Sequence, residues 1–344
     1  MKFLKGCIMF AFALITVTLG SGAVFAASDV VILKVHHFLP PSSNFHQKVL
    51  LPWCEKINKE SHGKLKCQIY PSMPPAQLLD QARNGIADVV WTLPTYQAGP
   101  FIKAEVFELP FLARTSEGGS QALWDFIQKD ALDEFKGVKL LFTHLHDGNQ
   151  LFMGSKQVKR LEDLKGLKIR TSGRLGTQAL SALGAIPMQM PAPAVPDAIA
   201  KGVVDGASIP WEVSTAFKLQ EICKTITETA PNQNKMSYSI FVFAMNPAKY
   251  NSLPPNLKKV IDNNSGLAAS KWAGKTFDSF TAPARQIAVQ RHDIINVLSP
   301  AEYNRWVKAT ERVDDEWIKE VNARGFNGAA LLKDAKALLR KYHD

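Results

Sequence analysis

The sequence has 344 residues, of which 46% are hydrophobic and 21% are charged, as in ordinary globular proteins. This length is long for a single compact core and suits a chain that forms two lobes. The formal net charge is +10, but the basic residues are scattered singly. No ribbon of alternating aromatic and basic residues occurs, so we expect no nucleic-acid partner.

The N-terminus has the pattern of a secretory signal peptide. Lys2 and Lys5 precede an apolar run over residues 8–19, and Ala23-Val24-Phe25-Ala26 places small residues before a cleavage site. An uncleaved membrane anchor is the alternative, which the short apolar run disfavours because about 20 residues are needed to span a bilayer. We therefore predict that residues 1–26 are removed and that the mature protein is exported.

Three cysteines remain after that cleavage: Cys54, Cys67 and Cys223. An odd number leaves at least one thiol free. Cys54 lies in a predicted helix and Cys67 in the next predicted strand, so a disulfide between them is feasible, but the sequence does not give the Cα separation that decides it. No Cys-x-x-Cys or Cys/His spacing suggests zinc, and we expect neither a metal nor a cofactor.

The first part of the chain alternates between the two kinds of secondary structure. Residues 30–35 are β-branched and read as a strand, and apolar residues then recur every four positions over 45–57, which predicts a helix. A strand over 65–70, a helix over 76–84 and a strand over 88–91 follow. Alternation of this kind favours parallel sheets covered by helices.

A similar unit returns later in the chain. Gly202-Val203-Val204-Asp205 follows a predicted helix and repeats the spacing of Gly85-Ile86-Ala87-Asp88, with Trp91 and Trp211 near the ends of the two following strands. The repeat predicts two similar lobes. Further elements are predicted at 161–170, 239–246, 255–292 and 294–298. No low-complexity linker separates the lobes, so the chain is expected to cross between them more than once.

Several stretches carry a family resemblance when taken together and in order. They are Phe107-Glu108-Leu109-Pro110-Phe111-Leu112, Glu162-Asp163-Leu164-Lys165-Gly166-Leu167-Lys168-Ile169-Arg170, and Leu183-Gly184-Ala185 through Met190-Pro191 to Gly202-Val203-Val204-Asp205-Gly206. Over essentially the whole mature chain, the sequence resembles the solute receptors of tripartite ATP-independent periplasmic (TRAP) transporters, of the dicarboxylate-receptor-like type.

The resemblance implies an α/β, two-lobed periplasmic-binding-protein fold with a ligand cleft between the lobes, crossing strands and a long hinge-spanning helix. We expect the first lobe to comprise residues 27–150 and about 239–278, and the second to comprise 151–238 and about 279–344. It also implies a periplasmic location, a small organic acid as ligand, and small and large TRAP membrane subunits as partners.

The resemblance assigns the central ligand contact to Arg170. A guanidinium offers paired donors that match a carboxylate; the alternative is a surface arginine paired with Glu162 or Asp163. Gln150 stands where relatives often have a second arginine. This departure favours a monocarboxylate with an apolar or aromatic part over a dicarboxylate, with a keto acid as a further possibility.

Other candidate ligand contacts lie in loops at strand ends, where open α/β lobes place their ligands. Tryptophans there are also common in lobe packing, and histidines after a strand commonly cap backbone groups. The candidates are Asn149, Trp91, Trp211, Tyr96, His37, Asn44, Asn234 and Tyr238.

An enzyme is the competing class of function. No His-Glu-x-x-His helix, Gly-x-Ser-x-Gly elbow, Walker loop or dinucleotide fingerprint occurs in the sequence. His144, His146 and Asp147 form a small cluster that could serve acid–base chemistry or a metal, although a polar strand end is the simpler interpretation. We therefore predict a solute receptor that is not an enzyme; a sensory receptor with the same fold stays open.

Overall fold

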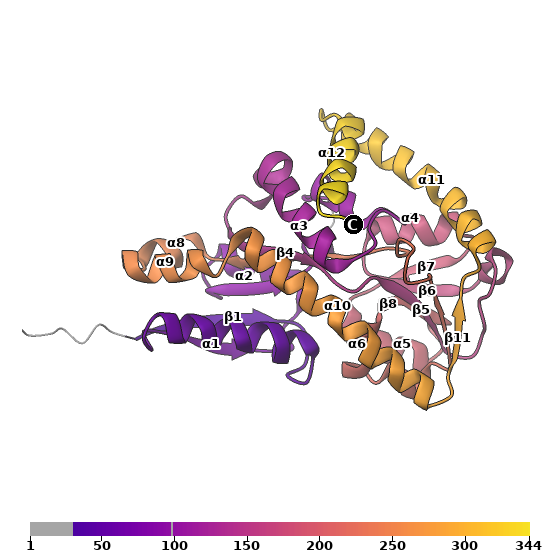
Figure 1. The fold of residues 1–344 in the computed structure, drawn as a ribbon, viewed down its shortest axis with the longest axis horizontal. Coiled ribbons are helices and arrows are strands. Elements are labelled where there is room, and N and C mark those ends of the chain that lie inside the picture. The colour runs from indigo at the N-terminus through magenta and orange to yellow at the C-terminus, as the bar shows by residue number, and fades with distance from the viewer. Residues whose placement is uncertain (1–29, 98) are drawn as a thin grey trace, which may run out of the picture.

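The computed structural model describes residues 30–97 and 99–344 (Figure 1). The predicted signal peptide lies outside the described residues. Within the described ranges, no helix combines the length and the apolar character that a membrane crossing requires.

The first sheet has five strands in the order β2-β1-β3-β10-β4. β1 pairs in parallel with β2 and β3, whereas β10 runs antiparallel to β3 and β4. The strands are β1 (Val31–His37), β2 (Leu65–Tyr70), β3 (Val89–Thr92), β4 (Lys139–Leu145) and β10 (Ile240–Met245). The parallel arrangement predicted from the alternation is confirmed for β1, β2 and β3.

The second sheet has six strands in the order β11-β9-β5-β8-β6-β7. β6 is parallel to β7 and β8, and β5 is antiparallel to β8 and β9. The strands are β5 (Asn149–Met153), β6 (Lys168–Thr171), β7 (Ile186–Gln189), β8 (Gly206–Pro210), β9 (Thr225–Glu228) and β11 (Ile294–Val297).

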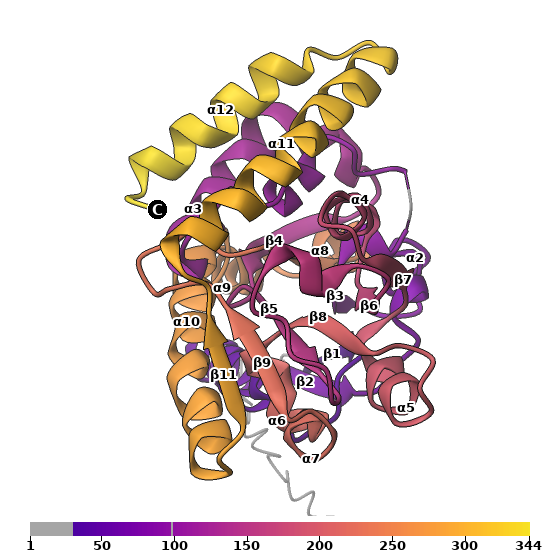
Figure 2. The same ribbon diagram turned by 90° about the vertical axis from the view of Figure 1, so that its right-hand side faces the viewer.

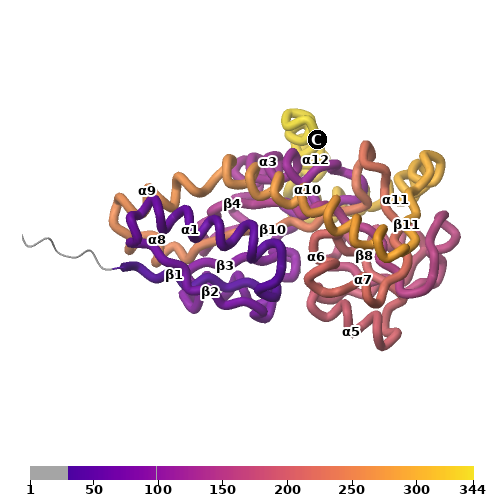
Figure 3. Tube along the Cα trace, turned by 60° about the horizontal axis from the view of Figure 1, so that its bottom comes forward, coloured from indigo at the N-terminus to yellow at the C-terminus, as the bar shows by residue number. Residues whose placement is uncertain are grey.

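Helices cover both sheets, and Figures 1 and 3 show the two halves of the molecule with α10 running across both. The helices of the first half are α1 (Leu51–Glu60), α2 (Leu78–Arg83), α3 (Ser116–Phe126), α8 (Pro247–Ser252) and α9 (Pro255–Asn263). Those of the second are α4 (Arg174–Ala182), α5 (Val195–Ala200), α6 (Trp211–Ala216) and α7 (Leu219–Ile222). The long helices are α10 (Gly266–Gln290), α11 (Pro300–Ala323) and α12 (Gly328–Lys341).

The chain crosses between the sheets several times. It passes from β4 to β5, returns from β9 to β10, and crosses again through α10, which packs on α3 and β4 near its start and on α6 further along. The predicted two-lobed α/β fold with crossing strands and a long spanning helix is confirmed.

The C-terminal helices do not belong to one lobe. Trp306 of α11 packs into the apolar cluster of the second sheet, whereas Trp317 of α11 and Leu339 of α12 join the core of the first sheet. Figure 2 shows α11 and α12 passing over the top of the molecule. Residues 279–344 therefore divide between the lobes, because the apolar faces of these helices find partners on both. Asn149 and Gln150, predicted in the first lobe, start β5 of the second sheet.

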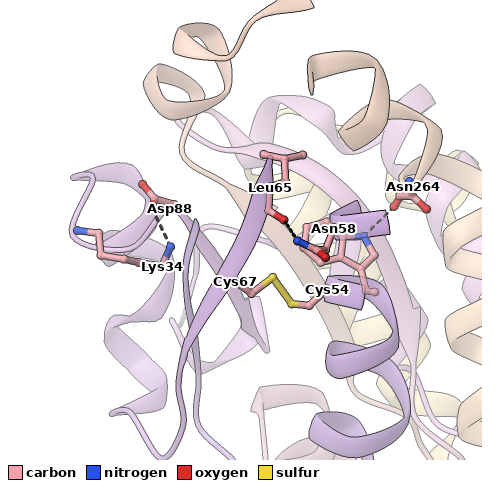
Figure 4. The surroundings of a disulfide bond; sticks show 8 residues. Lys34, Cys54, Asn58, Leu65, Cys67, Asp88 and Asn264 are labelled. Carbon is pink, nitrogen blue, oxygen red and sulfur yellow. Dashed lines mark hydrogen bonds between the residues drawn. A yellow bond between two sulfur atoms is a disulfide. The ribbon is translucent and has the colours of Figure 1, made fainter. Parts of the chain in front are cut away.

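A disulfide links Cys54 of α1 to Cys67 of β2, with their Cα atoms 5.9 Å apart (Figure 4). The same helix and strand are joined again where the Asn58 side-chain amide donates to the Leu65 carbonyl oxygen at 2.8 Å. The question that the sequence left open is thus settled in favour of the bond. Cys223 is a buried free thiol.

The repeated turn has the same conformation in both lobes. Gly85 and Gly202 have φ values of +71° and +67°, the left-handed conformation that glycine adopts without strain at the end of a helix. The prediction of left-handed helix ends at these glycines is confirmed.

The aspartate of each repeat has the same role as well. The Asp88 carboxylate accepts a hydrogen bond from the Lys34 N–H of β1 at 2.8 Å, and Asp205 accepts one from the Lys168 N–H of β6 at 2.8 Å. Each aspartate fixes the start of its strand beside the neighbouring parallel strand.

Candidate ligand-binding site

A cavity lies where the strand ends of the two sheets meet. The free space in it, including the part open to solvent, is about 380 Å³. Its lining comprises Phe38, Leu39, Trp91, Leu93, Tyr96, His146, Asn149, Arg170, Ser172, Ala192, Ile209, Pro210, Glu212, Val213, Ser239 and Phe241. Residues of both lobes therefore surround a space suited to a small ligand.

Arg170 supplies the positive charge of the cavity. It is only 2% exposed, and its guanidinium donates from Nε to the Met190 carbonyl oxygen at 2.9 Å and from Nη1 to the Ser208 carbonyl oxygen at 3.2 Å. Nη2 is buried and has no hydrogen-bond partner within residues 30–97 and 99–344. Burial lowers the pKa of Arg170, and the neighbouring Tyr96 opposes that shift. An arginine stays charged in proteins, so the guanidinium is fixed in place and its Nη2 group is left to donate to an anion.

Glu212 is the acidic residue of the cavity lining. It is 2% exposed, and its Oε1 is buried without a hydrogen-bond partner in the described part of the chain. Burial raises its pKa well above the usual value, the charge of Asp147 raises it further, and the Phe45 backbone acts in the opposite direction. Because desolvation disfavours the ionised form, the neutral carboxyl group is favoured.

Aromatic rings form one wall of the cavity. The Trp91 ring stacks on Phe38, Phe45 and Phe241 with centroid separations of 4.9, 3.7 and 4.7 Å. The Trp91 Nε1–H donates to His144 Nε2 at 2.8 Å. This hydrogen bond fixes the orientation of the indole, and the wall offers flat apolar surface to a bound molecule.

The histidine cluster noted in the sequence is buried and neutral. His144 Nδ1 lies 2.9 Å from the Leu145 carbonyl oxygen, to which an Nδ1–H can donate. The other ring nitrogen, Nε2, accepts from the Trp91 indole. The backbone nitrogens of Gly148 and Ser239 lie 2.9 Å from Nδ1 and Nε2 of His146, and the neutral ring accepts a hydrogen bond at whichever of its nitrogens carries no hydrogen. Burial lowers the pKa of both histidines to about 3. The cluster therefore supports the cavity wall. Across the described residues, no group of three or more His, Cys, Asp or Glu side chains is placed to hold a metal ion.

Polar contacts join the two lobes around the cavity. The Asn44 amide of the first lobe donates to the Glu212 carbonyl oxygen of the second at 3.1 Å. The Ala192 N–H donates to the Tyr96 hydroxyl at 3.2 Å, and the Ser172 and Ser239 hydroxyls lie 2.9 Å apart. These contacts depend on the two lobes lying close together, so the structure represents a closed form.

Four of the predicted site residues line the cavity together: Arg170, Asn149, Trp91 and Tyr96. Gln150 does not, although it follows Asn149 directly. Successive side chains of a strand point to opposite faces, so β5 turns Asn149 towards the cavity and Gln150 away from it. The Gln150 amide donates to the Gly148 carbonyl oxygen at 3.4 Å.

Trp211 also lies outside the cavity. It begins α6, where the chain turns back onto the second sheet, and its ring packs edge-on against Phe152 with a centroid separation of 4.8 Å. Its Nε1–H donates to the Glu228 carboxylate at 3.0 Å. The tryptophan thus packs within its lobe, which was the alternative to a ligand contact.

The remaining predicted residues have structural partners instead. His37 is buried, with Nε2 2.9 Å from Nδ1 of His46, and the Asn234 amide donates to the Phe111 carbonyl oxygen at 2.8 Å. Tyr238 is buried in the core of the first sheet. Asn44 forms the interlobe contact described above and does not line the cavity.

Sequence reasoning missed several lining residues. Glu212 and Val213 follow Trp211 directly, and Phe38 follows the His-His pair, so each lies within two residues of a residue that was singled out. Ser172 and Ser239 likewise lie within two residues of Arg170 and Tyr238. Phe241 had no comparable signal, because only the pairing of distant strands places it at the cavity.

The fold and the cavity define a two-lobed receptor with a site for a small anion. A family profile for bacterial extracellular solute-binding proteins, family 7, matches residues 35–320. The chain belongs to this family.

Three solved structures are similar over nearly the whole chain. A TRAP solute binding protein from Rhodoferax ferrireducens T118, with copurified benzoate, is 42% identical with a TM-score of 0.90, covering 91% of this chain and 99% of that chain. A marine metagenome TRAP solute binding protein specific for aromatic acids, with 3-hydroxybenzoate, is 41% identical with a TM-score of 0.90, covering 92% of this chain and 100% of that one. A third, from Bordetella bronchiseptica with bound mandelate, is 29% identical with a TM-score of 0.84, covering 90% and 99%.

The family and these neighbours are solute-binding receptors rather than enzymes. The predicted resemblance to TRAP solute receptors is confirmed, as is the predicted function of a receptor for a small organic carboxylate.

Proposed function

We propose that this protein is the periplasmic receptor of a TRAP transporter and that its ligand is an aromatic monocarboxylate. The observation that carries the proposal is the buried Arg170 guanidinium, held by two carbonyl oxygens with Nη2 unpaired at a cavity walled by aromatic rings. A carboxylate would give Nη2 the acceptor that it lacks.

The charge of the lining supports a single carboxylate on the ligand. Among the residues that the structure places around the cavity, Arg170 is the one lysine or arginine, and His146 is neutral at physiological pH. A second carboxylate would be buried without a cation, which is costly. The aromatic wall favours a flat apolar body, and the benzoate, 3-hydroxybenzoate and mandelate bound by the similar receptors are acids of this kind.

Binding is proposed to proceed by closure of the lobes. Arg170 belongs to the second lobe and the aromatic wall to the first, so only a ligand that contacts both can shift the population towards the closed form. The small and large TRAP membrane subunits are the proposed partners that receive the ligand from this form. An unchanged radius of gyration in solution on adding a bound ligand would contradict closure.

The proposal is tested by thermal unfolding of the mature protein with benzoate, mandelate, succinate and pyruvate, in the wild type and in Arg170→Met. Binding to the native state alone raises the melting temperature. We expect a rise with the aromatic acids that is absent in Arg170→Met, since truncating one partner of a buried charge pair typically costs about 2–5 kcal/mol. A larger rise with succinate than with any aromatic acid, or a rise that the variant keeps, would contradict the proposal.

A further inference from the structure

Two buried polar atoms in the cavity lining have no hydrogen-bond partner in the described ranges. They are Nη2 of Arg170 and Oε1 of Glu212. The other polar side chains of the lining are already paired: the Ser172 and Ser239 hydroxyls with each other, and the Asn149 amide with Ser237. An unpaired buried polar group costs about 1–3 kcal/mol, so the empty cavity leaves two groups for a ligand to satisfy.

The two groups lie at different places along the second lobe. Arg170 is paired with Ala207 inside β8, whereas Glu212 follows the end of that strand and lies next to the first lobe, where its carbonyl oxygen accepts from Asn44. A ligand whose carboxylate binds Arg170 therefore reaches Glu212 with a different part of its structure.

The surroundings of Glu212 suit a neutral partner. The ionisable group that acts on it is Asp147, whose carboxylate accepts from the Glu212 N–H at 3.2 Å. Burial raises the pKa of Asp147 to about 7. A neutral carboxyl group can donate and accept a hydrogen bond at once, and so can a hydroxyl group.

We propose that Glu212 binds a hydroxyl group of the ligand and so selects hydroxylated aromatic acids over the unsubstituted acid. The inference rests on the proposed function, because it assumes that the carboxylate of the acid binds Arg170. A site that hydrogen-bonds a substrate hydroxyl discriminates against the analogue that lacks it, since its own buried polar group is then left unpaired.

The test compares dissociation constants for benzoate and for 2-, 3- and 4-hydroxybenzoate by isothermal titration calorimetry at pH 7. The proteins are the wild type, Glu212→Leu, Glu212→Gln and the control Glu108→Gln, which changes a buried glutamate outside the lining. We expect one hydroxybenzoate isomer to bind the wild type at least about tenfold more tightly than benzoate, which is the value of roughly one buried hydrogen bond.

The variants separate recognition from structural support. In Glu212→Leu, the ratio of the benzoate dissociation constant to that of the preferred hydroxybenzoate should fall to about one, while benzoate still binds. In Glu212→Gln, most of the preference for the hydroxybenzoate should remain, because the amide also donates and accepts hydrogen bonds. The control should keep the wild-type ratio. Thermal unfolding without ligand shows whether each variant is folded.

The inference would be overturned if the wild type bound benzoate at least as tightly as each of the three hydroxybenzoates. It would also be overturned if Glu212→Leu kept the wild-type ratio of the benzoate and hydroxybenzoate dissociation constants. Either result leaves the proposed function intact. Failure of all four acids to bind the wild type would instead overturn the proposed function itself, so the two failures are distinguishable.

Discussion

The two lobes contribute different chemistry to one cavity. The phenylalanine, tryptophan and tyrosine side chains of the lining come from the first lobe, through β3, β10 and the turns that follow β1 and β3. Both side chains with unpaired polar atoms come from the second lobe. Under the proposed function, the second lobe binds the carboxylate and the first lobe covers the apolar part of the ligand. Closure is favourable because it removes apolar surface from water.

The repeated units show how similar backbones acquire these different roles. Trp91 lies within β3 and faces the cavity, but Trp211 lies one residue beyond β8 and packs against its own sheet. Trp91 precedes the last residue of its strand, whereas Trp211 follows the last residue of its strand and begins α6, a difference of two residues. The turn into α6 places this indole against its own sheet and leaves Glu212 at the cavity.

The largest expected effect concerns the cross-link of the first lobe. Replacing Cys54 and Cys67 together by serine opens a disulfide with a sequence separation of 13 residues, and loops of about this length are stabilised by roughly 3 kcal/mol. We expect a lower melting temperature with an unchanged affinity at 25 °C, because neither cysteine lines the cavity. Cys223→Ser is the control; an affinity loss in the double variant would show that the cavity depends on the cross-link.

The comparison of the tryptophans is sharpened by Trp91→Phe and Trp211→Phe. Each removes an indole N–H that donates to His144 or to Glu228. The buried His144 loses its donor, so Trp91→Phe should cost about 1–3 kcal/mol of stability, whereas the partly buried Glu228 keeps its pair with Arg285, so Trp211→Phe should cost less. Only Trp91→Phe should weaken aromatic acid binding, by roughly tenfold. Equal losses of affinity, measured by calorimetry, would refute the division of roles.

Glu108 of the first lobe makes stability depend on pH. Burial raises its pKa to about 8 although Thr95 and the Ile240 N–H donate to its carboxylate. A raised pKa means that the folded protein binds the proton more tightly, so this stabilisation is complete below the ordinary pKa and is lost as the pH rises through about 8.

The free energy of unfolding of the wild type, minus that of Glu108→Gln, should therefore decrease by about 1 kcal/mol per pH unit as the pH rises from 5 to 8. Urea unfolding across this range measures it. A difference independent of pH would mean that Glu108 stays ionised in the folded protein.

The smallest effect is expected for the interlobe hydrogen bond. Asn44→Ala removes the donor to the Glu212 carbonyl oxygen, and a hydrogen bond of this kind contributes about 0.5–1.5 kcal/mol. Affinity should fall by about three- to tenfold, through faster dissociation of the ligand. Asn234→Ala, which loses a contact with the Phe111 carbonyl oxygen instead, should lower stability without changing the dissociation rate.

The sequence by itself determined the α/β alternation and the paired turns at Gly85 and Gly202. These features depend on local chemistry, namely apolar periodicity and the conformational freedom of glycine. Arg170 was predicted from the family resemblance, because its local pattern equally allowed a surface arginine. The disulfide and the lobe boundaries needed distances that no local pattern contains.

Only the tertiary structure decided which face of each strand and loop meets the cavity. It placed Asn149 inside and Gln150 outside, turned Trp211 into its lobe, and brought Glu212 to the cavity. The division of α11 and α12 between the lobes was decided in the same way. The physical reason is that side-chain direction depends on register and on packing between segments that are distant in sequence.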